Sequence, residues 1–116
     1  MANAMQFYEE LDNLLGCKLP ISASKIGNLT KLALKLEDHA AEVVEIIERF
    51  TRECPPAFKL PGLYVIDSIC RNSKSKQKDD IFVPLFSEKV RTIYQNLASC
   101  PASDKVCLLS YKDLRR

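Results

Sequence analysis

The amino-acid sequence predicts an all-α fold, with about six helices joined by short loops in one right-handed or bundle-like array. Apolar residues recur at the i, i+3, i+4 and i+7 spacing of an α-helix in one segment after another. No segment shows the alternation typical of a strand, and there is no repeat and no low-complexity tract. Hydrophobic residues make up 47% of the 116 residues, which is enough apolar material for one core.

The first two helices are expected before residue 37. The first covers residues 3–15 and ends at Gly16, and the segment around Pro20 is an extended linker because proline biases the preceding residue away from helix. Ser22 is a suitable N-cap for the second helix, which begins at Ala23. The apolar stripes of these helices are Met5, Phe7, Tyr8, Leu11, Leu14 and Leu15, and then Ile26, Leu29, Leu32, Ala33 and Leu36.

The third helix is expected after a cap at Asp38, and it stops at the Cys54–Pro55–Pro56 run. One face forms a stripe that should be buried, made of Ala40, Val43, Val44, Ile47 and Phe50. The opposite face should be a plain solvent face, made of Glu42, Glu45, Glu48, Arg49 and Arg52.

The fourth helix is expected over residues 58–73, with a start distorted by Pro61. A basic loop follows, since residues 71–78 contain four cations and no anion. Asp80 then opens a further helical region in which Ile81, Phe82, Leu85 and Phe86 should be buried and Phe86, Val90, Ile93, Tyr94 and Leu97 continue as another helix. After a turn at Cys100–Pro101, Ser103 or Asp104 caps a last short helix.

Composition narrows the class of protein. The net charge of +2 provides no overall field for duplex DNA or an acidic membrane, and no apolar run is long enough to span a bilayer. The N-terminus shows no secretory signal, so we expect an intracellular protein. Five scattered cysteines, an odd number with no CxxC pair, favour free thiols in a reducing compartment.

The sequence offers little for catalysis. Its single histidine, His39, provides almost no ligand supply for a zinc site, and we expect neither a metal nor a cofactor. It contains no GxSxG, P-loop or HExxH motif. We therefore expect a protein that is not an enzyme.

A polar stripe lies on the otherwise apolar fourth helix. Tyr64, Asp67, Ser68 and Arg71 fall at i, i+3, i+4 and i+7 and share one helical face. Such a face could line a groove in which Asp67 accepts a hydrogen bond, Arg71 holds a phosphate or carboxylate, and Tyr64 packs on a ring. Alternatively, Asp67 and Arg71 could simply form an i, i+4 pair with Tyr64 packed beside them. The spacing alone leaves both interpretations open.

Three segments of the sequence are distinctive: ISASKIGNLTKLA at residues 21–33, AFKLPGLYVIDSICRN at residues 57–72 and FVPLF at residues 82–86. Together they resemble the CTD-interacting domain, a module that binds the carboxy-terminal repeat tail of RNA polymerase II. The sequence is similar in particular to the SR-related CTD-associated factors, which are nuclear proteins that also carry RNA-binding regions elsewhere. The resemblance covers roughly residues 5–104.

This resemblance implies a right-handed superhelix of seven or eight helices, similar to VHS and ENTH domains. It also implies a groove between the second, fourth and seventh helices for the Tyr-Ser-Pro-Thr-Ser-Pro-Ser repeat. In that groove Asp67 would take the hydroxyl of the repeat tyrosine, and phosphorylation of repeat serines would strengthen binding by adding negative charge. The peptide-binding residues that the resemblance implies are Ile21, Ser22, Lys25, Asn28, Tyr64, Asp67, Arg71 and Asn72.

The C-terminal segment departs from the family pattern. Residues 105–116 contain no tryptophan, and Arg115 and Arg116 are not at the place that matches the arginine of the family, so we expect residues 1–116 to form a CTD-interacting domain with its last helices missing. The implied function is a nuclear, non-enzymatic module that couples transcription to mRNA processing or termination. The alternatives are a VHS- or ENTH-like membrane-trafficking adaptor, or a truncated product with impaired binding. Residues 1–15 carry acids and no cation, which argues against the membrane adaptor.

Overall fold

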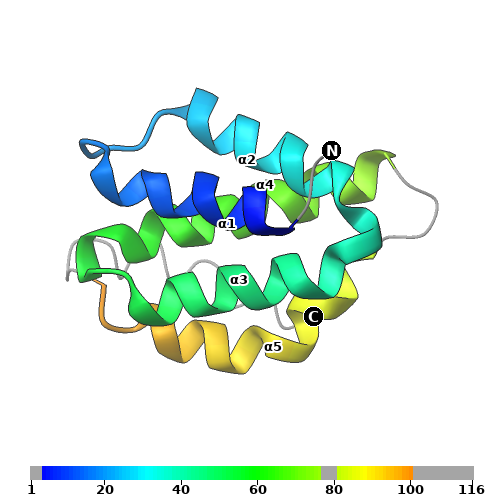
Figure 1. Ribbon diagram of the computed structural model, residues 1–116. Coiled ribbons are helices and arrows are strands. Elements are labelled where there is room, and N and C mark those ends of the chain that lie inside the picture. The colour runs from blue at the N-terminus through cyan, green and yellow to red at the C-terminus, as the bar shows by residue number, and fades with distance from the viewer. Residues whose placement is uncertain (1–3, 77–80, 101–116) are drawn as a thin grey trace.

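The computed structural model describes residues 4–76 and 81–100. This part of the chain contains five α-helices, three short 3-10 turns and no strand (Figure 1), which confirms the all-α prediction. The elements are α1 (Ala4–Asp12), η1 (Asn13–Gly16), α2 (Ala23–Lys35), η2 (Glu37–His39), α3 (Ala40–Glu53), η3 (Pro56–Phe58), α4 (Lys59–Lys76) and α5 (Phe82–Leu97).

Helix α3 lies at the centre of the array. It packs against α5 on one side and α1 on the other, and it also contacts α4. Helix α2 packs against α4 and α1, so α1 lies between α2 and α3 in Figure 1, with α4 behind them. The neighbouring pair α2 and α4 carries the polar residues that the sequence indicated.

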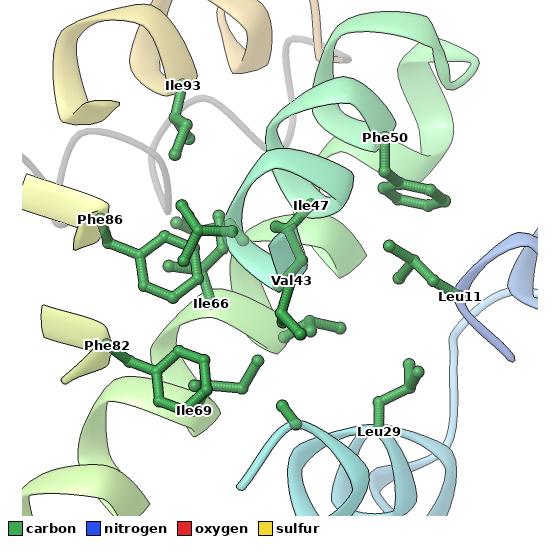
Figure 2. Packing of buried hydrophobic residues seen from close by; sticks show 14 of the residues in the cluster. Leu11, Leu29, Val43, Ile47, Phe50, Ile66, Ile69, Phe82, Phe86 and Ile93 are labelled. Carbon is green, nitrogen blue, oxygen red and sulfur yellow. The ribbon is translucent and has the colours of Figure 1, made fainter. Parts of the chain in front are cut away.

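The core is built around the predicted stripe of α3, all five residues of which are buried. In Figure 2, Phe82 and Phe86 of α5 lie on one side of Val43 and Ile47, and Leu11 of α1 lies on the other side. The two phenylalanine rings stack with their centroids 6.5 Å apart. Full burial of one such side chain contributes about 1.5–3 kcal/mol to stability. Through this stripe, α3 joins α1 and α5 into one core.

The starts of two helices differ from the prediction. Residues 37–39 form η2, so α3 begins at Ala40 and carries no side-chain cap, and the predicted cap at Asp38 is wrong. Helix α4 begins at Lys59, directly after the 3-10 turn η3, and its α-helical span includes Pro61. Proline is tolerated there because it is the third residue of the helix, where backbone N–H groups have no intrahelical partner.

Two predictions fail around the basic segment. Helix α4 continues to Lys76, three residues beyond its predicted end, so residues 74–76 are helical and not part of a loop. Ile81 is exposed and precedes α5, which is one continuous helix in which Phe82 and Phe86 are buried as expected. The expected turn at Cys100–Pro101 and the helix capped by Ser103 or Asp104 extend outside the described residues.

Glu48 is an exception to the predicted solvent face of α3. Its Oε2 lies 3.0 Å from Arg52 Nη1 and 3.4 Å from Asn96 Nδ2 of α5. Asn96 also donates to Thr51 Oγ1 at 3.2 Å. At the same end of α3, the buried Lys59 donates from Nζ to the carbonyl oxygens of Thr51 and Arg52. A cation there satisfies carbonyl groups that the helix leaves without intrahelical partners.

The described cysteines are free thiols: Cys17, Cys54, Cys70 and Cys100, as the sequence predicts. Burial raises the pKa of the Cys54 thiol, and this effect outweighs the nearby Lys59 ammonium, which lowers it. Cys107 lies outside the described residues. None of the helices in the described part is both long and apolar enough to cross a membrane.

Candidate peptide-binding face of α2 and α4

One face of α4 points away from the core. Buried residues occupy the inner face of this helix, including Val65, Ile66 and Ile69. Tyr64 is 38% exposed, and Asp67 and Arg71 follow it at three- and four-residue spacings on the outer face. The helical period therefore places a phenol, a carboxylate and a guanidinium in one row beside α2.

Asp67 and Arg71 form an ion pair on this face. Arg71 Nε lies 3.0 Å from both Asp67 Oδ1 and Asp67 Oδ2. The Asp67 side chain is 21% exposed and the Arg71 side chain is 75% exposed. Because the contact is made through Nε and most of the side chain faces solvent, the guanidinium can still meet an anion. The i, i+4 pair and an accessible polar face are therefore both present.

The start of α2 contributes a second set of polar groups. Ser22 Oγ accepts a hydrogen bond from Lys25 N at 3.2 Å, which confirms the predicted N-cap. Lys25 and Asn28 are both exposed. A lysine beside the first turn of a helix provides positive charge next to backbone N–H groups, and this arrangement suits an anion.

Ser68 is turned from the polar face toward α2. Its Oγ lies 2.7 Å from Oγ of the buried Thr30, and Thr30 Oγ1 also donates to Ile26 O at 2.8 Å. Since a hydroxyl carries one proton, Ser68 then donates to Thr30. Asn72 Nδ2 donates to Ser68 O at 2.7 Å on the same helix. This pairing fixes α2 against α4 directly beneath the polar row, and residue spacing did not reveal it.

An apolar hollow adjoins Tyr64 at the start of α4. Its walls come from the linker before α2 and from η3 and α4, and they are Leu19, Pro20, Ile21, Ala57, Leu60, Pro61 and Tyr64. Ile21 and Tyr64 were candidate site residues in the sequence, whereas Leu19, Ala57 and Leu60 were not. In the sequence, these three residues share only their position next to a proline. This pattern is too weak to identify a site without the fold.

The fold and this mixed polar and apolar face define a helical interaction module. The chain belongs to the CID domain family, because a family model described as the CID domain matches residues 5–110. The predicted family and the superhelical fold are thereby confirmed.

Relatives and solved structures agree with this assignment. SR-related and CTD-associated factor 8, from Mus musculus and from Homo sapiens, is 44% identical over 101 residues, which cover 85% of this chain and 8% of that protein. The chain thus spans less than a tenth of the length of these relatives.

Two solved structures share the fold. The CTD-interacting domain of Seb1 from S. pombe matches with a TM-score of 0.81 at 22% identity, over 97% of this chain and 86% of that chain. The yeast Nrd1 CID in complex with Sen1 NIM1 matches with a TM-score of 0.79 at 26% identity, with the same coverage.

Proposed function

We propose that this chain binds the phosphorylated heptad-repeat tail of RNA polymerase II along the face of α2 and α4. The observation that carries the proposal is the row of Tyr64, Asp67 and Arg71 beside the N-terminus of α2. Relatives named as CTD-associated factors, and a related CID solved in complex with Sen1 NIM1, support a peptide as the ligand.

The carboxylate and the hollow suit the tyrosine of the repeat. Asp67 can accept a hydrogen bond from a phenolic hydroxyl, while the apolar walls around Ile21 and Tyr64 can cover the ring. Tyr64 also offers a flat surface for a proline of the repeat. These two requirements, an acceptor and an apolar surface, fit a Tyr-Ser-Pro sequence better than a peptide that is uniformly charged.

The cations suit a phosphate. Arg71 and Lys25 are exposed on neighbouring helices, and Ser22 and Asn28 lie on the same part of α2. A phosphoserine adds negative charge and three acceptor oxygens, so a guanidinium and an ammonium are its natural partners. Asn72 completes the proposed set on α4.

This function makes the chain a non-enzymatic module that acts in the nucleus, where it couples transcription to mRNA processing or termination. Any RNA contact would belong to regions outside this chain. We do not favour the alternative of a membrane-trafficking adaptor, because no feature of the described part of the chain favours a lipid ligand over a peptide. We propose no cofactor and no metal.

Fluorescence anisotropy with labelled two-repeat peptides tests the proposal. The peptides are unmodified, phosphorylated on one serine position at a time, or phosphorylated with the residues in scrambled order. We expect at least one phosphorylated repeat to bind more tightly than the unmodified peptide and than its scrambled version. Equal binding of the ordered and scrambled phosphopeptides would reduce the interaction to charge alone and contradict the proposal.

A further inference from the structure

We propose that a second groove, between α1 and α3, is a docking site for a basic amphipathic helix of a partner protein. Six large apolar side chains are exposed in the described part of the chain. Leu19 and Tyr64 line the hollow of the proposed peptide-binding face. Met5, Tyr8 and Leu15 instead line the groove between α1 and α3. Five of these six side chains thus line one of two separate grooves, and the sixth is Ile81 before α5.

The second groove is continuous along α3. It consists of two adjoining hollows that share Tyr8, Ile46 and Arg49, and it extends from His39 before the helix to Cys54 after it. The 14 residues of α3 correspond to a length of about 21 Å. Met5, at 63% exposure, and Tyr8 form the α1 side, and Ile46 faces them from α3. None of the residues that line this groove belongs to the α2–α4 face.

Only part of the apolar stripe predicted for the first helix is buried in the core. Phe7, Leu11 and Leu14 are buried, whereas Met5, Tyr8 and Leu15 from the same predicted stripe remain exposed. Isolated exposed apolar residues are common on protein surfaces, but a row of them lining a groove marks an interaction site.

The charge around the groove defines the chemistry of the partner. Asp12, Glu42 and Glu53 line it, against Arg49 and His39. His39 Nδ1 lies 3.5 Å from Glu42 Oε1, so these two groups face each other at one end. Carboxylates outnumber cations even when the imidazole is protonated. An apolar groove whose charged lining is acidic in its majority favours a ligand with apolar side chains flanked by lysine or arginine.

The proposed occupant is an amphipathic helix, which can lay its apolar stripe into an apolar groove between two helices. A helix satisfies its own backbone and can present an apolar stripe to the groove. A helix of about 14 residues matches the length of α3.

The test uses a capped 14-residue peptide with leucine at i, i+3, i+4 and i+7 and lysine elsewhere. A second peptide has the same leucines with glutamate in place of lysine. Each peptide is titrated into the isotopically labelled chain while amide resonances are followed by NMR. We expect saturable binding of the lysine peptide, with shifts confined to α1, η1 and the outer face of α3, and binding of the glutamate peptide at least about tenfold weaker.

Variants of each surface test where the lysine peptide binds. Met5→Gln alters a strongly exposed side chain and preserves the fold, and Glu53→Gln removes one negative charge from the groove. Each should lower the affinity for the lysine peptide several-fold. Tyr64→Ala is the matched control on the α2–α4 face and should leave the affinity for the lysine peptide unchanged. Equal affinity for the two peptides, shifts centred on α2 and α4, or self-association of the chain through Met5 and Tyr8 would each overturn the proposal.

Discussion

Thr30 Oγ1 lies 2.7 Å from Ser68 Oγ, and this contact joins α2 to α4 beneath the proposed peptide-binding residues. Thr30 is buried, so its hydroxyl depends on protein partners. The two helices carry opposite walls of the proposed site. This pair of hydroxyl groups therefore helps to hold the two helices of the proposed site together.

Removing one of these hydroxyls should destabilise the protein. Thr30→Val keeps the shape of the side chain and leaves Ser68 without its partner, which should lower the free energy of unfolding by about 1–2 kcal/mol. Urea denaturation of Thr30→Val, Ser68→Ala and the double variant gives the coupling energy, expected at about 0.5 kcal/mol or more. Strictly additive losses would show that the two hydroxyls do not stabilise each other.

Arg71 should control the salt dependence of phosphopeptide binding. Exposed charges are screened over about 8–10 Å at physiological ionic strength, so affinity should fall as salt is added. Arg71→Ala should flatten this dependence and reduce the preference for phosphorylated peptide. Anisotropy titrations at several salt concentrations measure both effects.

Arg52→Ala is a matched control for that experiment. Arg52 pairs with Glu48 at i, i+4, at 3.0 Å, just as Arg71 pairs with Asp67. Each exposed pair should contribute only about 0.3–0.5 kcal/mol to stability. If Arg71→Ala retained the full phosphate preference, or if Arg52→Ala lost it equally, Arg71 would be only the helical partner of Asp67.

Lys59 should be important for stability although it is not one of the proposed ligand contacts. It is 4% exposed, and its ammonium donates to the last carbonyl groups of α3. Lys59→Met keeps much of the apolar stem but leaves these carbonyls without their donor, at an expected cost of about 1.5–3 kcal/mol. Lys31→Met, at an exposed position of α2, is the control and should cost less than about 0.5 kcal/mol in the same urea experiment. Equal midpoints for the two variants would contradict this role of Lys59.

The Cys54 thiol should react slowly in the folded protein. Its pKa is raised because burial disfavours the thiolate, so a smaller fraction is ionised at pH 8 than for an exposed cysteine. Cys17 is less buried and is the internal reference. Alkylation followed by peptide mass spectrometry should show Cys54 modified at least about tenfold more slowly than Cys17, and the difference should vanish in urea. Faster modification of Cys54 in the folded state would mean that this part of α3 is open.

Much of the fold could be predicted from local spacing. The stripe around Val43 and Ile47 identified the central helix, because a helix packed on several sides must bury residues at the helical period. The row of Tyr64, Asp67 and Arg71 was predicted in the same way, since residues three and four apart share a face regardless of the rest of the chain.

Other features depend on tertiary packing and were not predictable. The pairing of Thr30 with Ser68 joins residues 38 positions apart and requires α2 to lie on α4. The exposure of Met5 and Tyr8 depends on which faces of α1 pack against another helix. The periodicity of apolar residues does not distinguish a packed face from an exposed one. The cap expected at Asp38 was replaced by a 3-10 turn that leads directly into α3.

We propose that Asp67, on the face of α4, recognises the repeat peptide. The most direct measurement is the affinity of a phosphorylated two-repeat peptide for Asp67→Ala, compared with Asp38→Ala, in which an exposed carboxylate of η2 is removed instead. Loss of the acceptor should weaken binding by about 1–3 kcal/mol, roughly 5- to 150-fold, because a ligand hydroxyl is left unpaired. Asp38→Ala should bind like the parent. If Asp67→Ala binds the phosphopeptide as tightly as the parent, Asp67 is not part of the site and the account is contradicted.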